Sequence, residues 1–179
     1  MIVLNGPPAC GKSTLARMYA DQHPFALNLD IDRVRGMVGQ WWEDPGTAGL
    51  LARAIALAAA RIHFTAGYDV VIPQFLGRLT FIEQVEELAR EVGADFHEII
   101  LLDSKDNVLR RFAERSRTAA DPVHVDAQEM LDRAGGRDRL SAMYDQLAQV
   151  IAARPTAMVV PTTDGEIAEA YQAFLNCLS

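Results

Sequence analysis

The stretch Gly6-Pro7-Pro8-Ala9-Cys10-Gly11-Lys12-Ser13 has the spacing G-x-x-x-x-G-K-S. It directly follows an apolar run at residues 1–4, which predicts a short buried strand, and residues 13–20 have the pattern of a helix start. A glycine-bounded loop between a strand and a helix is the context that makes this spacing a Walker A motif, or P-loop. Without lysine, serine and that context, the same glycines would indicate only a turn. The sequence therefore predicts a site for a nucleoside triphosphate.

Each part of this loop has a chemical reason to bind a triphosphate. Its backbone N–H groups point inward, and the N-terminus of the helix behind them carries partial positive charge. We expect Lys12 to neutralise the β- and γ-phosphates and Ser13 to offer its hydroxyl to Mg²⁺. Gly6 and Gly11 fit where the chain takes a positive φ or approaches the phosphates closely. The predicted nucleotide-binding residues of the loop are Gly6, Pro7, Pro8, Ala9, Cys10, Gly11, Lys12, Ser13 and Thr14.

The composition predicts one soluble domain over residues 1–179. Seventeen basic against twenty-four acidic residues give a net charge of −7, which disfavours bulk attraction for nucleic acid but leaves room for a local basic groove. No basic leader precedes the first strand, and no apolar run approaches the length of a membrane helix. The two cysteines suggest no disulfide framework. We therefore expect a cytoplasmic protein that has no membrane partner.

Short apolar runs alternate with segments of helical period along the rest of the chain. The predicted strands are residues 1–4, 25–29, 70–72, 98–102 and 157–160, and the predicted later helices are 47–66, 79–92, 105–116, 126–152 and 165–178. This alternation favours an α/β fold with a parallel sheet covered on both faces. Two polar or glycine-rich interruptions are candidate mobile parts: a substrate lobe at about 36–50 and a lid at about 111–126.

Two carboxylates and an arginine follow the second predicted strand, at the sheet edge where ligands bind in such folds. Asp32 could accept the proton of an attacking hydroxyl, and Asp30 could hold Mg²⁺ directly or through water. Arg35, one helical turn beyond Asp32, could stabilise a transferring phosphate or grip an anionic acceptor. The alternative is that Asp30 or Asp32 only caps the next helix.

The P-loop together with Asp32 and Arg35 resembles the kinase domain of phage polynucleotide kinase. The resemblance implies that Asp32 is the general base and that Arg35 lies at the active site. The spacing of Asp30 and Asp32 is also similar to that of shikimate and gluconate kinases, where the pair handles metal and acceptor, and chloramphenicol phosphotransferase carries a comparable aspartate. These small kinases imply a three-layer P-loop NTPase fold, with a five-stranded parallel sheet in the order 2-3-1-4-5, helices on both faces and a helical lid.

The same resemblance implies roles for residues further along the chain. Arg111 and Arg115 match an R-x-x-x-R pair at the lid, in which one arginine stacks on adenine and the other reaches the transferring phosphate. Arg117 is a second candidate for the phosphate role. The turn that contains Thr162 resembles the adenine-binding loop. An exposed helix face and an ordinary turn would give similar patterns.

The third predicted strand departs from the polynucleotide kinase pattern, since it ends in Ile72-Pro73-Gln74 without an aspartate. Gln74 and Arg78 would then form a different acceptor pocket, while Trp41 and Trp42 could stack a ring or simply pack. The leading interpretation is an ATP-dependent, Mg²⁺-assisted kinase that phosphorylates a hydroxyl. Its acceptor is either a 5′-hydroxyl polynucleotide or a small molecule. The alternative is a nucleotide-binding regulator or ATPase without a phosphoryl acceptor.

Overall fold

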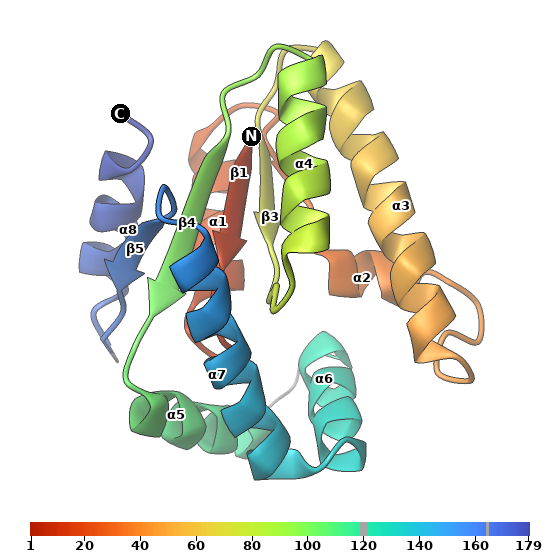
Figure 1. Cartoon of the computed structure of the whole chain (residues 1–179), viewed down its shortest axis with the longest axis vertical. Helices are drawn as coiled ribbons and strands as arrows, with labels where there is room; N and C mark the ends of the chain where they lie inside the picture. The colour runs from red at the N-terminus through yellow and green to blue at the C-terminus, as the bar shows by residue number, and fades with distance from the viewer. Residues whose placement is uncertain (119–121, 164) are drawn as a thin grey trace.

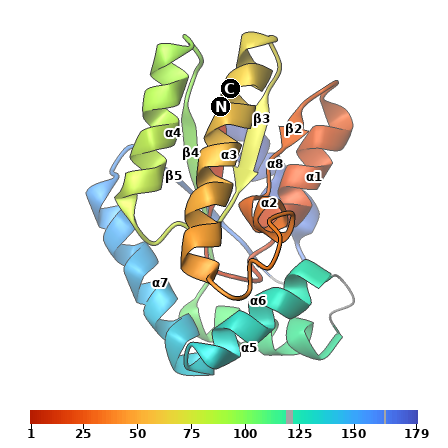
Figure 2. The ribbon, with the colours of Figure 1, turned by 90° about the vertical axis from the view of Figure 1, so that its right-hand side faces the viewer.

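A computed structural model of the chain describes residues 1–118, 122–163 and 165–179, apart from the side chains of residues 115–118, 122–124 and 127. Five parallel strands form one sheet in the order β2-β3-β1-β4-β5. Helices cover both faces of this sheet, with α1 and α8 on one side and α3 and α4 on the other (Figures 1 and 2). The predicted three-layer α/β fold and its strand order are confirmed.

The strands and helices have the following bounds. The strands are β1 (Ile2–Asn5), β2 (Leu27–Asn28), β3 (Val70–Pro73), β4 (His97–Leu102) and β5 (Met158–Pro161). The helices are α1 (Lys12–Gln22), α2 (Ile31–Gly36), α3 (Pro45–Thr65), α4 (Leu79–Glu91), α5 (Lys105–Thr118), α6 (Pro122–Arg133), α7 (Gly136–Ala153) and α8 (Ile167–Asn176).

The central strands are apolar on both faces because each face meets a layer of helices. On one face, Val3 and Ile72 pack with buried side chains of α3 and α4. On the other face, Leu4 and Leu101 pack with side chains of α1 and α8. Along the β1–β3 ladder, Leu4 lies opposite Pro73, so the P-loop after β1 and the loop after β3 leave the sheet at the same edge. That edge is the carboxyl edge, where the functional residues gather.

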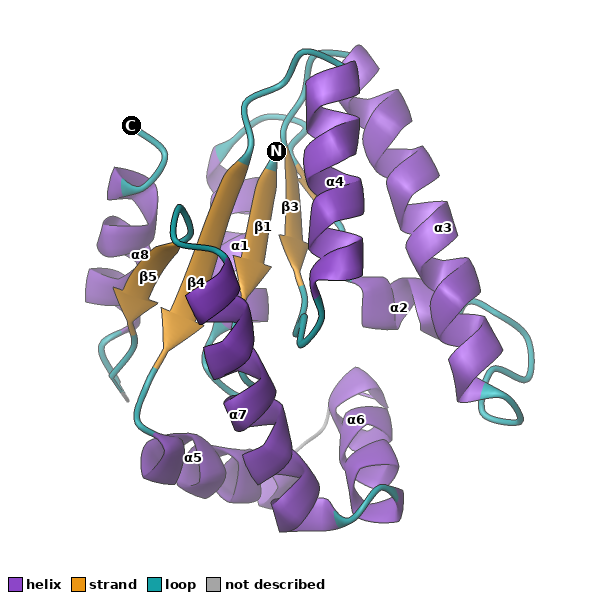
Figure 3. Ribbon diagram, viewed as in Figure 1, coloured by secondary structure: helices purple, strands orange, loops and turns teal. Residues whose placement is uncertain are grey.

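The helices α5 and α6 and the first half of α7 form a helical lid beyond the carboxyl ends of the strands (Figure 3). A separate apolar cluster of Phe112, Leu131 and Leu140 holds the three helices together. The single helix predicted at 126–152 is wrong. Gly135 and Gly136 have φ values of +113° and +57°, a left-handed conformation that glycine adopts without strain, and they separate α6 from α7.

Two further differences from the sequence predictions concern β2 and α3. The second strand is only Leu27–Asn28, because Phe25 takes a positive φ of 61° that no strand allows. By length and composition, α3 is the one helix among the described residues that could cross a membrane. However, its alanines at every fourth position from Ala48 to Ala60 are buried in the fold, as in a helix of a globular domain.

Candidate active site

The P-loop is held at the end of β1 by a buried asparagine. Asn5 Oδ1 accepts hydrogen bonds from the N–H groups of Gly6 and Leu76, both at 2.8 Å, and Asn5 Nδ2 donates to the Leu76 carbonyl at 3.0 Å. Gly6 has a φ of +148°, and a Cβ there would lie 2.5 Å from the carbonyl oxygen of Leu101. The start of the loop therefore has no room for a side chain, and it is tied to the loop that follows β3.

Lys12 is largely buried at the first turn of α1, and its ammonium group is held by the loop itself. Nζ donates to the carbonyl oxygens of Gly6 at 2.9 Å and Pro7 at 2.7 Å. Gly11, with a φ of +94°, precedes the helix, and Ser13 is exposed beside it. The loop therefore presents the Lys12 ammonium and the exposed Ser13 hydroxyl at the N-terminus of α1, which is the arrangement expected of a triphosphate cradle.

Asp30 is the N-cap of α2. Its Oδ1 accepts hydrogen bonds from the backbone N–H groups of Asp32 at 3.0 Å and Arg33 at 3.4 Å. Burial, and after it the nearby charge of Asp32, raises the pKa of the Asp30 carboxyl above its ordinary value. The capping alternative considered for both aspartates therefore applies to Asp30, whereas Asp32 lies in the first turn and is available for another role.

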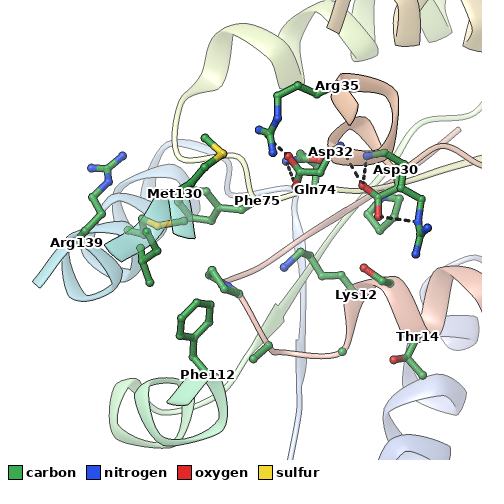
Figure 4. A pocket seen from close by; sticks show the side chains of 18 of the residues that line it. Lys12, Thr14, Asp30, Asp32, Arg35, Gln74, Phe75, Phe112, Met130 and Arg139 are labelled. Atoms are coloured by element: carbon green, nitrogen blue, oxygen red, sulfur yellow. Dashed lines mark hydrogen bonds and ion pairs between the residues drawn. The ribbon is translucent and has the colours of Figure 1, made fainter. Parts of the chain in front are cut away.

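Asp32 is held by two side chains that come from different elements (Figure 4). Its Oδ1 pairs with Arg35 at 3.0 Å, and its Oδ2 accepts a hydrogen bond from Gln74 Nε2 at 3.2 Å. The guanidinium carbon of Arg35 lies 4.8 Å from the ring centre of Trp41, which is cation–π range. Trp41, Arg35, Asp32 and Gln74 therefore form one chain of contacts that fixes the carboxylate.

The P-loop, Asp32 and the helical lid enclose one cavity of about 740 Å³. Lys12, Asp30 and Asp32 lie on one side of it, and Phe112, Met130 and Arg139 lie on the other (Figure 4). We call five side chains on the lid side and in the loop after β3 the apolar wall: Phe75, Phe112, Met130, Leu131 and Met143. A volume of this size is in the range of small-molecule sites.

Arg111 and Thr162 come together away from that cavity. Arg111 donates to the Thr162 carbonyl oxygen at 3.4 Å and forms an ion pair with Asp103 at the end of β4. Arg111 Nε and Thr162 Oγ1 are buried and have no partner within the described part of the chain. The two residues predicted to contact adenine are therefore neighbours, although they lie far apart in the sequence.

A family model described as an AAA domain matches residues 1–140. The chain belongs to this family. No sequence among the curated proteins matches it. Among solved structures, a gluconokinase from Sinorhizobium meliloti 1021 is similar with a TM-score of 0.64 and 16% identity, over 99% of this chain and 90% of that one. A shikimate kinase from Bacteroides thetaiotaomicron has a TM-score of 0.59 and 21% identity, over 99% and 97%. The AAA-domain chain thus has a P-loop kinase-like fold.

The remaining predicted residues of this AAA-domain protein do not all lie at the cavity. Arg115 and Arg117 lie on α5, but their side chains are outside the described part, and the predicted lid extends over residues 119–121, which are also outside it. Gln74 lines the cavity as expected, whereas Arg78 stands at the start of α4 and is not among the residues that line it.

The oxygen donors near the P-loop suit Mg²⁺ that arrives with a nucleotide. Within the described residues, no three His, Cys, Asp or Glu side chains cluster as metal ligands, so phosphate oxygens and water would complete the coordination. Ser13 and Asp30 both line the cavity with Lys12 and Asp32. A hydroxyl and a partly desolvated carboxylate are ligands that Mg²⁺ accepts, so the residues present fit the ion.

Sequence reasoning missed two parts of this site. Asn5 follows the first apolar run, and no sequence pattern marked it as the residue that holds the P-loop backbone. The apolar wall was also missed, because Phe75, Phe112 and Met130 belong to separate segments that resemble ordinary core sequence.

Proposed function

We propose that this protein is an ATP-dependent kinase that transfers the γ-phosphate to a hydroxyl of a small molecule. Asp32 acts as the general base, while Lys12 and Arg35 stabilise charge on the transferring phosphate, with Arg115 as a further candidate from the lid. Ser13 and Asp30 hold Mg²⁺, and Arg111 and Thr162 contact the adenine. The loop residues Gly6 to Thr14 bind the phosphates.

The observation that carries this proposal is the shared cavity of Asp32 and the P-loop. A residue that only capped α2 would not need contacts from Gln74 and Arg35, and the cap is already supplied by Asp30. A carboxylate fixed opposite a phosphate cradle is what a phosphoryl transfer to an alcohol requires. The fold shared with the gluconokinase and shikimate kinase structures supports the same reaction class.

The proposed step is a direct displacement. The acceptor oxygen forms a bond to the γ-phosphorus as the bond to the bridging oxygen of ADP breaks, and the hydroxyl proton passes to Asp32. The donated hydrogen bond from Gln74 and the ion pair with Arg35 keep the Asp32 carboxylate in place for that proton. Mg²⁺ supplies charge neutralisation on the phosphates when it is bound.

A small acceptor is favoured over a polynucleotide. The cavity is bounded by the helical lid on the side opposite the P-loop, and the chain carries a net charge of −7. A nucleic-acid site would instead need a basic surface that follows a phosphate backbone. We expect the protein to act in the cytoplasm, where ATP and small hydroxyl compounds are both present.

A phosphoryl-transfer screen tests the proposal. γ-labelled ATP would be incubated with pooled metabolites, antibiotics and 5′-hydroxyl oligonucleotides, and the label would be followed into product. Transfer to a small molecule is the expected result. ATP hydrolysis or binding without transfer to any pool would favour the regulator or ATPase alternative.

A further inference from the structure

The cavity has two chemically different ends, and the difference bears on what the acceptor is. The charged residues at the end near α1 and α2 are Lys12, Arg17, Asp30, Asp32, Arg33 and Arg35. The end near the lid carries the apolar wall, and Arg139 is the one charged residue among the described residues that line it there. Figure 4 shows Arg139 at the far side of the cavity from Lys12, with Met130 and Phe75 nearer to Asp32.

The side chains of the apolar wall face the cavity, and some of them also pack between the lid helices. Phe112 and Leu131 belong to the cluster that joins the lid helices, and Met143 packs against that cluster. Phe75, Met130 and Met143 are only half-buried and line the open volume. A ligand with an apolar body would remove this surface from water, which is favourable.

A second cavity lies beside the first, and both apolar and charged side chains line it. It measures about 540 Å³ and adjoins the first at Met130 and Ala134, which line both. Trp41, Trp42 and Pro45 also line it, together with the charged residues Asp126, Glu129 and Arg133. Trp41 also stacks on Arg35, so this aromatic surface begins next to the residue that holds Asp32. An acceptor with its hydroxyl at Asp32 can therefore contact Met130 and Ala134, which join the two cavities.

A polyhydroxylated acceptor fits this surface poorly. Those of its hydroxyls that face the apolar wall would lose water against phenyl and thioether groups without gaining a hydrogen bond there, and such transfers are unfavourable. Resting on the proposed kinase function, we infer that the acceptor is an alcohol with an apolar, ring-bearing body rather than a polyol acid. One hydroxyl takes the γ-phosphate at Asp32 while ADP leaves, and the ring lies against Met130 and Phe75.

The first test compares acceptors of the two chemistries. Arylalkyl alcohols with one primary hydroxyl, such as 3-phenylpropan-1-ol and 4-phenylbutan-1-ol, would be assayed with ATP beside D-gluconate and shikimate. We expect kcat/KM for the aryl alcohols to be at least about tenfold higher, as for a matched apolar pocket. Equal or better transfer to gluconate or shikimate would overturn the inference and leave the kinase proposal standing.

Calorimetry tests the inference independently of turnover. With a non-hydrolysable ATP analogue present, the aryl alcohols should bind with a negative heat-capacity change, the signature of apolar burial. Absence of binding would overturn the inference. If binding occurs but no alcohol of either set is phosphorylated, the failure lies with the kinase proposal.

Matched variants test whether aryl-alcohol affinity depends on the apolar wall. Met130→Gln keeps the side-chain length but adds an amide, and we expect about a tenfold loss of aryl-alcohol affinity with unchanged ATP affinity. Met130→Leu should retain binding because it conserves volume and apolarity. Met37→Gln is the control, since Met37 is 83% exposed and does not line the cavity. Equal affinity in Met130→Gln and Met37→Gln would contradict the inference.

Discussion

The P-loop and the apolar wall face the same cavity but are built in different ways. The P-loop is one continuous segment, and its shape depends on Gly6, on the Asn5 hydrogen bonds and on the start of α1. The apolar wall takes side chains from the loop after β3 and from three helices that are separated in sequence. The proposed nucleotide site is therefore encoded locally, whereas the proposed acceptor surface exists only after the chain has folded.

This difference has a consequence for substitution. If the proposed function holds, a change in the P-loop alters groups that every phosphoryl transfer uses, so its effect should not depend on the acceptor. A change in the wall should alter which acceptor is used and leave the nucleotide alone.

Replacing Lys12 should abolish most activity with any acceptor. Lys12→Ala removes a cation from a water-poor phosphate site, and we expect a loss of about two or more orders of magnitude in turnover, together with weaker ATP binding. Lys105→Ala is the matched control, because Lys105 is the only other lysine and pairs with Asp145 outside the cavity. Wild-type turnover and ATP affinity in Lys12→Ala would show that the P-loop assignment is wrong.

Replacing Arg35 by lysine should have a moderate effect. The positive charge remains, but the planar stacking on Trp41 is lost, which corresponds to about a two- to fivefold reduction in kcat. The double variant Arg35→Lys with Trp41→Leu should be no worse than Arg35→Lys alone if the two side chains act through each other. Additive losses in steady-state kinetics would mean that Trp41 acts independently of Arg35.

Salt should have little effect on acceptor binding. A small neutral alcohol releases no condensed counterions, so its affinity should stay nearly flat between about 50 and 200 mM salt. A 5′-hydroxyl oligonucleotide, titrated in parallel, would lose affinity by orders of magnitude over that range if it were the true acceptor. Tight oligonucleotide binding with a steep salt dependence would contradict a small-molecule acceptor.

A substitution in the scaffold should change stability with pH but leave turnover unchanged. Burial raises the pKa of Glu98 above its ordinary value of 4.5, against the opposing influence of Arg154. The folded state therefore holds this proton more tightly than the unfolded state. The free energy of unfolding that Glu98 contributes is present below pH 4.5 and is lost as pH rises from there through the raised pKa of the folded state. Glu98→Gln should lack this contribution, as urea midpoints at pH 4, 5.5 and 7 would reveal. An identical pH slope in both proteins would contradict it.

The fold could be predicted to a large extent because its signals are local. Continuous apolar runs marked the central strands, and the P-loop placed the first strand and helix. The errors occurred where local pattern and backbone conformation disagree. The helical period on either side of Gly135 and Gly136 predicts one helix over 126–152, yet these two glycines adopt left-handed conformations that periodicity does not record.

The candidate site was predictable only in part, for a related reason. Asp30 and Asp32 were found because they follow a strand in a recognisable order, but their division of roles depends on which carboxylate accepts the two N–H groups of α2. The contact from Gln74 to Asp32 crosses 42 positions of sequence. No single-sequence pattern connects such residues, and the same holds for the apolar wall.

Substituting Asp32 tests the central claim most directly. Asp32→Asn keeps the shape of the side chain but removes the base, and Asp30 already caps α2, so folding should be unaffected. Asp44→Asn is the control for the same substitution elsewhere in the chain. Asp44 caps α3 as Asp30 caps α2, and it does not line the cavity. ATP affinity, melting temperature and turnover would be measured on both variants.

We predict that Asp32→Asn binds ATP and melts like the wild type while turnover falls by about a hundred- to ten-thousandfold. Asp44→Asn should match the wild type in all three measurements. Intact binding, intact folding and intact turnover in Asp32→Asn would contradict the assignment of Asp32 as the general base of a kinase.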